Sequence, residues 1–337
     1  MKVLVYSFRN KIDNLLEIDE SFKNVKESLE MVGVKYTTIP IGEYDIIHIN
    51  RPMSESKLNE LNERNVPVVV SAFFDEFFPE GSFLEVNASE NANELRLTQK
   101  SIALFQKVDL ILVPNEKFVK LLVDAGIKTK IIPIIPGTNL ATYDYYREDE
   151  KNIFYRYFKE DPNREIVMAI GAGMSNGDGI NPVINAANKN KNVGFYYFTL
   201  NKEGNKIPRN VKKKLKSSPK NLHYVVNVPL DVYKSALINS KIYLIPGYNQ
   251  PDITSLMAAM ASRCQIVSRK HELLSGYIEN EVSGYLAEYS ETLGILIREL
   301  LNGEIKPTVD NSYEFVKRHS LETYGNELKE VYESLLK

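Results

Sequence analysis

The sequence predicts an α/β protein with two domains, each built around a mostly parallel sheet. Short apolar runs alternate with longer amphipathic runs along all 337 residues. Runs such as 44–50 (YDIIHIN) and 108–114 (VDLILVP) are continuously apolar, which is typical of strands covered by helices on both faces. A chain of this length is also expected to divide into two domains of ordinary size.

In the first half, apolar runs predict strands and amphipathic runs predict helices. The strands are expected at 3–8, 44–50, 66–74, 108–114 and 130–137, and the helices at 19–31, 97–108 and 116–126, the last closed by Gly126. The following segment, 143–165, is charged and aromatic and has no clean strand pattern. We interpret it as the connection between the domains together with an entry helix.

The second half repeats this alternation. Strands are expected at 166–173, 192–200, 222–228, 241–246 and from 265 onward, and helices at 181–189, 231–240 and 253–263. The tail, 313–337, is amphipathic and is expected to be interrupted at Gly325. One side of the tail can be formed by Leu321, Tyr324, Leu328, Val331 and Leu335.

The composition is that of a soluble globular protein, with 43% hydrophobic and 26% charged residues. The net charge of −2 gives no overall field that would favour nucleic acid or an anionic membrane. The single cysteine, Cys264, excludes an intramolecular disulfide, indicates a reducing, cytoplasmic compartment, and is expected to be a buried, inert thiol. No apolar run reaches the roughly 18 residues of a membrane span, and the opening MKVLVYSF is interpreted as a strand rather than a signal peptide.

The segment 245–267 (IPGYNQPDITSLMAAMASRCQIV) carries the most information about function. It reads as the end of a strand, a loop, a helix and the start of the next strand. Asp252 is expected to cap the helix, because a short carboxylate accepts hydrogen bonds from the first free backbone N–H groups. Apolar residues then recur at helical spacing at Leu256, Met257, Met260 and Ala261.

This layout resembles the donor-sugar end of retaining, family-4-like glycosyltransferases of the GT-B fold. Within that group the chain is most similar to the short bacterial enzymes that add a hexose to diacylglycerol glycolipids. The resemblance is carried by 32–50, 108–137, 235–247, 261–267, 280–288 and 319–336. It implies two Rossmann-like domains that face a cleft, with the C-terminal helix crossing back to the first domain. The expected domains are therefore 1–145, completed by the helix 320–337, and 146–319.

At the donor-sugar positions the chain departs from the family pattern. The family usually carries two glutamates eight residues apart, and Gln250 and Ala258 stand at those positions. The family places Arg and Lys after the first strand of the second domain, where this chain has 171–181 (GAGMSNGDGIN), with Asp178 near the position of the lysine. An anion at a diphosphate site is repulsive. Asp252 adds a second anion at a helix N-terminus that would otherwise hold the diphosphate.

The first domain also lacks two features of the family. A glycine-containing loop is expected near the donor, and residues 17–19 (Glu-Ile-Asp) stand there instead. The family places a histidine near the reacting sugar, and the nearest counterpart here is Ser71. The resemblance therefore implies a scaffold whose catalytic positions have degenerated to Ser71, Gln250 and Ala258.

Two hypotheses follow from this resemblance. The favoured one is a noncatalytic homologue that serves as a regulatory, stabilising or acceptor-binding partner, in a hetero-oligomer with an active paralogue or as a homodimer. The alternative is an active, metal-independent retaining enzyme that moves a hexose from a donor such as UDP-glucose, with no further cofactor. An epimerase or phosphorylase on the same fold is less favoured, since no cationic phosphate pocket stands out. The candidates for a donor pocket are Gly171, Gly173, Asn176, Asp178, Tyr248, Asn249, Gln250, Asp252 and Thr254.

Other features have structural as well as functional interpretations. His48 is more typical of a strand-end histidine satisfied by backbone than of a catalytic base, and the four histidines show no metal-ligand spacing. The basic run 209–220 favours a solvated helix face over a site for nucleic acid or for a membrane at the inner face of the cell envelope. A cluster of phenylalanines either fills the core or forms a patch for a partner or membrane; it comprises Phe73, Phe74, Phe77, Phe78 and Phe83.

Overall fold

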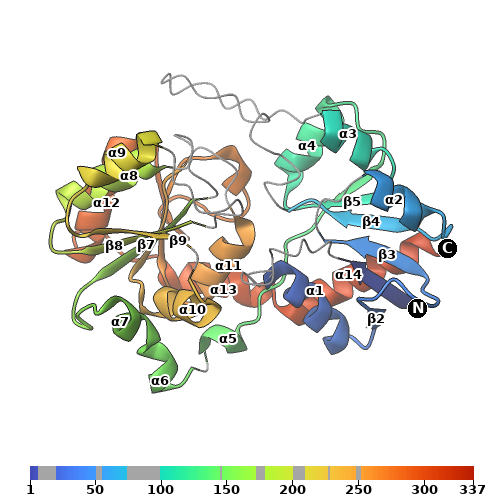
Figure 1. The fold of residues 1–337 in the computed structure, drawn as a ribbon, viewed down its shortest axis with the longest axis horizontal. Helices are drawn as coiled ribbons and strands as arrows, with labels where there is room; N and C mark the ends of the chain where they lie inside the picture. Colours follow the sequence, from blue (N-terminus) through green and yellow to red (C-terminus); the bar gives the residue numbers. More distant parts are fainter. Residues whose placement is uncertain are drawn as a thin grey trace.

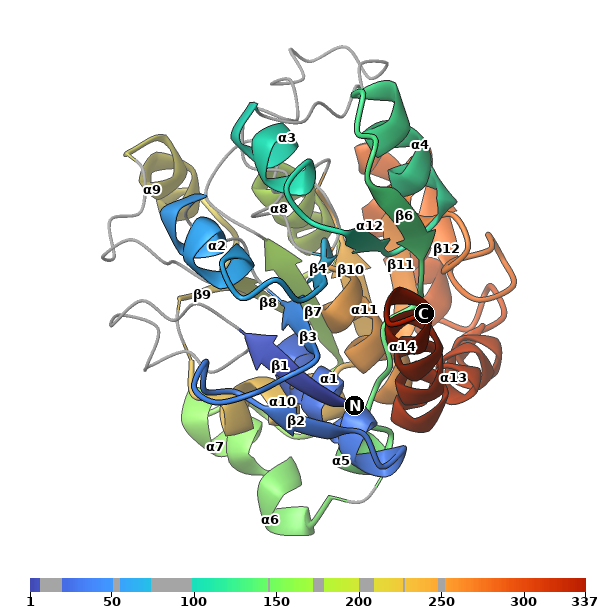
Figure 2. The same cartoon turned by 90° about the vertical axis from the view of Figure 1, so that its right-hand side faces the viewer.

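The computed structural model describes residues 1–6, 20–50, 55–73, 99–144, 146–171, 179–199, 209–226, 228–247 and 252–337. Two six-stranded sheets form two halves of the molecule, and helices lie on both faces of each sheet (Figure 1). In the view turned by 90° the first sheet lies in front of the second (Figure 2). The α/β class predicted from the apolar runs is confirmed.

The first sheet has the strand order β2-β1-β3-β4-β5-β6, and all of its strand pairs are parallel. Its inner strands β1, β3, β4 and β5 are buried on both faces, as their continuous apolar runs predicted, whereas the edge strands β2 and β6 are partly exposed. The strands are β1 (Lys2–Tyr6), β2 (Lys35–Thr37), β3 (Ile46–Ile49), β4 (Val68–Ser71), β5 (Leu110–Val113) and β6 (Lys130–Pro133). The helices are α1 (Glu20–Met31), α2 (Glu55–Asn62), α3 (Gln99–Phe105) and α4 (Glu116–Asp124).

The connection between the halves contains three short helices where one entry helix was expected. They are α5 (Ala141–Asp144), α6 (Glu148–Lys151) and α7 (Ile153–Phe158). Side chains of α10 (Leu230–Asn239) hold the break between α6 and α7. Ser235 Oγ accepts a hydrogen bond from the Phe154 amide at 2.9 Å and donates one to the Lys151 carbonyl at 2.8 Å, and Asn239 Nδ2 also donates to this carbonyl at 2.7 Å. These contacts come from distant residues, so the break could not be predicted from the local pattern.

The second sheet has the order β12-β11-β10-β7-β8-β9, again with parallel pairs only. Successive strands are added on one side of β7 up to β9, and from β10 onward on its other side. The first sheet has the same reversal of strand order between β1 and β3. Ligands of open α/β sheets bind at such reversals, outside the carboxyl ends of the strands.

The strands are β7 (Ile166–Gly171), β8 (Gly194–Thr199), β9 (Leu222–Val226), β10 (Ile242–Ile245), β11 (Gln265–Arg269) and β12 (Tyr285–Ala287). The remaining elements of this half are α8 (Ile180–Lys189), α9 (Arg209–Lys216), α11 (Ile253–Ala261), the 3-10 turn η4 (Glu272–Leu274) and α12 (Ser290–Leu301).

The C-terminal tail forms α13 (Val309–Arg318), which packs on α11, and α14 (Leu321–Leu335), which packs on α1. Both chain termini consequently lie on the first half (Figure 1). The expected interruption at Gly325 was wrong, because α14 runs through it without a break. A Cβ atom at Gly325 would lie only 2.4 Å from the Ser28 carbonyl oxygen, so glycine allows the two helices to touch.

Two predictions about individual features are confirmed. Cys264 is fully buried, and burial raises the pKa of its thiol to about 12, so it is an inert packing residue. Helix α9 carries exposed side chains at Lys212, Lys213 and Lys216, as expected of a solvated basic face. No helix in the part of the chain that the structure describes is long and apolar enough to cross a membrane.

Candidate functional site

The N-termini of α1 and α11 approach the same region between the two halves. Helix α1 comes after β1 along the chain, and α11 after β10, so both begin near the strand reversals. Glu20, in the first turn of α1, accepts a hydrogen bond of 2.5 Å from the Tyr143 hydroxyl. Tyr143 belongs to α5, which packs against α11 in the second half. The carboxylate at the start of α1 is therefore held by α5 of the connection, which lies against the second half (Figure 1).

A second carboxylate caps α11. Asp252 Oδ1 accepts the Ser255 amide at 3.1 Å, and Oδ2 accepts the Ser255 hydroxyl at 2.6 Å. The Ser255 hydroxyl in turn accepts a hydrogen bond of 3.2 Å from Tyr233. The cap predicted from the sequence is confirmed. Because Asp252 takes up an N–H group of this terminus and adds a negative charge, it competes with any anionic ligand there.

Two carboxylates, Glu20 and Asp252, and two ammonium groups, Lys23 and Lys234, lie close enough to interact electrostatically. Burial raises the pKa of Glu20 and the charge of Asp252 adds to the rise, while the Tyr143 hydrogen bond and Lys234 oppose it. Burial lowers the pKa of Lys234, and the charge of Lys23 lowers it further. No local sequence pattern singles out Glu20, Lys23 and Lys234, since each lies on an ordinary amphipathic helix and only the packing of the halves brings them together.

The structure describes only some of the predicted donor-pocket positions. Ala258 is 1% exposed and lies in the core, where the side chains on every side of α11 are buried. Thr254 is partly buried in the first turn of that helix. The other candidates, apart from Gly171 and Asp252, lie outside the described residues: Gly173, Asn176, Asp178, Tyr248, Asn249 and Gln250.

Gly171, a donor-pocket candidate, ends β7 at the carboxyl edge of the sheet. A Cβ atom there would lie 1.7 Å from the Tyr197 hydroxyl oxygen on β8 and 2.4 Å from the ring carbon that carries it. A side chain at residue 171 would therefore have to displace the buried ring of Tyr197. Gly179, with φ +85°, is constrained in a similar way, because a Cβ atom there would lie 2.6 Å from the Gly247 amide nitrogen. This close approach brings the start of α8 against the end of β10.

Replacing Gly171 with alanine is expected to lower the free energy of unfolding by about 1–3 kcal/mol, through overpacking against Tyr197. The same change made in a Tyr197→Leu background should cost less than about 0.5 kcal/mol, because the ring that meets the new methyl group is gone. A double-mutant cycle of urea midpoints measures this coupling. Equal costs in both backgrounds would mean that Tyr197 is not what excludes a side chain at residue 171.

Ser71 and Phe73 lie inside the first half. His48 Nε2 is 2.7 Å from Ser71 Oγ, and His48 Nδ1 is 2.5 Å from the Tyr332 hydroxyl of α14. The expectation that backbone groups satisfy His48 was wrong: side chains from β4 and α14 do so. Ser71 is fully buried and Phe73 is 3% exposed, so both side chains are part of the core. Phe74, Phe77, Phe78 and Phe83 lie outside the described residues.

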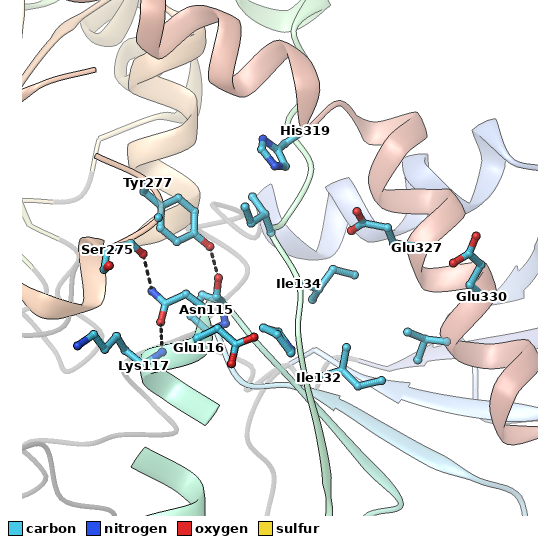
Figure 3. A pocket seen from close by; sticks show the side chains of 15 residues that line it. Asn115, Glu116, Lys117, Ile132, Ile134, Ser275, Tyr277, His319, Glu327 and Glu330 are labelled. Carbon is cyan, nitrogen blue, oxygen red and sulfur yellow. Dashed lines mark hydrogen bonds between the residues drawn. The ribbon is translucent and has the colours of Figure 1, made fainter. Parts of the chain in front are cut away.

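A cavity of about 590 Å³ lies between the two halves, on the side where α14 returns to the first half (Figure 3). Three hydrogen bonds join the halves at its edge, one of them from Asn115 Nδ2 to the Ser275 carbonyl at 3.4 Å. Asn115 Nδ2 donates to the Leu273 carbonyl at 2.6 Å, and the Tyr277 hydroxyl donates to the Pro114 carbonyl at 2.6 Å. Among the described residues, no three His, Cys, Asp or Glu side chains form a group that could hold a metal ion.

No protein-family model matches the chain. The chain is 25% identical to a processive diacylglycerol alpha-glucosyltransferase from Acholeplasma laidlawii, covering 100% of this chain and 99% of that protein. The crystal structure of HepE from Anabaena in complex with UDP-glucose is similar with a TM-score of 0.70 at 14% identity, covering 99% of this chain and 100% of that one. A structure of a GtfA/B complex is similar with a TM-score of 0.53 at 12% identity, covering 94% of this chain and 60% of that one. The chain therefore has the GT-B fold of glycosyltransferases and is similar over its whole length to a diacylglycerol glucosyltransferase.

Proposed function

We propose that this chain is a noncatalytic GT-B protein that acts as a partner subunit of an active glycosyltransferase in the synthesis of bacterial envelope glycolipids, polysaccharides or glycoproteins. The observation that carries the proposal is the pair of carboxylates at the two helix N-termini between the halves. Asp252 caps α11, and Glu20 stands in the first turn of α1. These are the termini at which a GT-B enzyme is expected to hold a nucleotide-sugar diphosphate.

The charges of this pair oppose such a donor. A carboxylate about 5 Å from a phosphate charge repels it by roughly 3 kcal/mol at the effective dielectric constant near a protein surface. Ala258 adds to this argument, because its buried methyl group offers neither charge nor hydrogen bond in place of a glutamate. Asp178 and Gln250, at the positions where the family has a lysine and a glutamate, support the same conclusion.

The role as a partner rests on the resemblance to proteins that assemble. One similar structure is that of a GtfA/B complex, which supports a hetero-oligomer with an active paralogue; a homodimer is the second possibility. The whole-length similarity to a diacylglycerol glucosyltransferase supports a place in the cytoplasm beside the inner face of the plasma membrane. A neighbouring gene for a paralogue with both glutamates would fit this role, and a solitary gene would count against it.

An active enzyme is the second candidate, and one observation favours it. The charges of Lys23 and Lys234 act on Glu20, so two ammonium groups lie near the place where a diphosphate would bind. In this alternative the protein moves a hexose from a donor such as UDP-glucose, the ligand named in the HepE structure, without a metal ion. Gln250→Ala should then abolish turnover, and an unaffected rate would reject a role for that residue.

Calorimetry with UDP-glucose and other nucleotide sugars tests the proposal. We expect no measurable binding by the natural protein at millimolar donor. The double variant Glu20→Gln/Asp252→Asn should gain measurable UDP binding under the same conditions, because both replacements keep a hydrogen-bonding side chain and remove the charge. Glu63→Gln/Glu333→Gln removes two exposed carboxylates elsewhere and should leave UDP binding unchanged.

Each outcome of the calorimetry decides between the candidates. Micromolar binding of UDP-glucose by the natural protein, with slow hydrolysis of the donor, overturns the noncatalytic proposal. Absence of binding across the donor panel rejects the active enzyme. If the Glu20/Asp252 double variant binds no better than the natural protein, the carboxylate pair is not what excludes the donor.

A further inference from the structure

The cavity between the halves has the size of a small-molecule site. Its volume of about 590 Å³ falls within the roughly 300–1,000 Å³ usual for such sites. The first half contributes residues 114–117 and 132–135, and the second contributes residues 275–277 and His319. Helix α14 lines a further side with Val331 and with the exposed residues Glu327 and Glu330. A molecule in this cavity would touch both halves and α14 at once.

The floor of the cavity is apolar. Ile132 and Ile134 reach into it from β6 and its extension, between α14 and the turn at Asn115 (Figure 3). Val331 faces them from α14. Ile134 is 6% and Val331 8% exposed, so packing fixes these side chains in place, and the partly buried Ile132 shows more of its surface. Such a surface suits the hydrocarbon or aromatic part of a ligand.

One side of the cavity is anionic. Glu327 and Glu330 stand three residues apart on α14 and thus on the same helix face. Neither has a hydrogen-bond or ion-pair partner among the residues that the structure describes. Burial raises the pKa of Glu327, and the charge of Glu330 adds to the rise. Two carboxylates beside an apolar wall, with no cation of their own, are complementary to a ligand cation.

The other titratable groups of the lining do not neutralise Glu327 and Glu330. Glu116 adds a third carboxylate from α4. Lys117 points away from Glu327 and Glu330 (Figure 3). His319 faces the cavity, and its Nδ1 is 2.8 Å from the Phe315 carbonyl, so Nδ1 carries the proton and Nε2 is left as an acceptor when the ring is neutral.

We propose that this cavity binds a small amphiphile with an apolar body and one cationic amine or ammonium end. The body lies against Ile132, Ile134 and Val331, and the cation lies beside Glu327 and Glu330. Because the cavity borders the Asn115–Leu273 and Tyr277–Pro114 hydrogen bonds, an occupant stabilises the arrangement in which the halves are joined there. The proposal does not depend on whether the protein is catalytic.

Three probes with one shared skeleton test the chemistry: 3-phenylpropylamine, 3-phenylpropanol and 3-phenylpropanoate. Calorimetry at pH 7.5 should give the tightest binding for the amine, at least fivefold weaker binding for the alcohol, and none for the carboxylate. Glu327→Gln/Glu330→Gln should weaken amine binding at least tenfold and leave alcohol binding within twofold. Glu333→Gln, which removes an exposed carboxylate from the same helix, should change neither.

A second variant keeps the test decisive if the glutamine pair proves unstable. Ile132→Trp fills the apolar floor and should abolish binding of both the amine and the alcohol, while circular dichroism confirms the fold. The proposal is overturned if the amine and the alcohol bind equally, if none of the three probes binds, or if the amine binds the glutamine variant as tightly as the natural protein.

Discussion

Replacing Gly325 with alanine is expected to lower the free energy of unfolding by about 1–3 kcal/mol. The new Cβ atom would lie 2.4 Å from the Ser28 carbonyl oxygen and 3.0 Å from a Val32 methyl carbon. The closest contact is with backbone, which cannot rotate away as a side chain can, so α1 and α14 must move apart. The measurement is the urea midpoint at constant m-value, since a change of midpoint alone reports stability.

The sign of this effect makes it a sharp test. In an isolated helix, glycine to alanine would stabilise by about 1 kcal/mol through helix propensity. Asn326→Ala, the next and exposed position of α14, serves as the control and should change stability by less than about 0.5 kcal/mol. A stabilising Gly325→Ala would show that the close contact of α14 with α1 is not needed in solution.

Between pH 7 and pH 5 the protein is expected to lose roughly 2 kcal/mol of stability through His48 alone. Burial lowers the pKa of His48 from 6.5 to about 3 in the folded protein. The unfolded chain therefore takes up a proton below pH 6.5 that the folded chain cannot accept. This contribution is fully present above pH 6.5 and is lost progressively as the pH falls toward 3.

Urea unfolding of the natural protein and of His48→Gln at both pH values isolates this contribution. The glutamine variant should lose about 2 kcal/mol less than the natural protein between pH 7 and pH 5. His319→Gln, at a partly exposed histidine, should retain the full loss. If the His48 variant loses as much as the natural protein, then His48 takes up a proton without unfolding, and its contacts with Ser71 and Tyr332 do not keep it neutral.

The order of strands and helices could be read from the sequence because each depends on local pattern. Continuous apolar runs predicted β3, β5, β7 and β10, and the structure places each within the predicted segment. The cap at Asp252 was equally predictable, because the hydrogen bond spans three residues of one chain segment. The GT-B architecture followed from the resemblance of several such segments in a fixed order.

Predictions from local sequence pattern were wrong where the structure depends on a contact between distant segments. Gly325 suggested a helix break, since glycine has low helix propensity, but its contact with Ser28 makes glycine the residue that fits. His48 suggested a strand end satisfied by backbone, whereas Tyr332, 284 positions away, provides one of its partners. Gly171 stood among the donor-pocket candidates, and only the structure shows that the ring of Tyr197 occupies the space of a side chain there.

By itself, then, the sequence determined the α/β class and the two sheets, because these depend on residue types and their spacing. Only the tertiary structure decided that Glu20 stands near Asp252, that Lys23 and Lys234 accompany them, and that Glu327 and Glu330 face an apolar cavity. The physical reason is that charge–charge interactions and cavities depend on distances in space between elements, and no local periodicity specifies how two sheets and a returning helix pack.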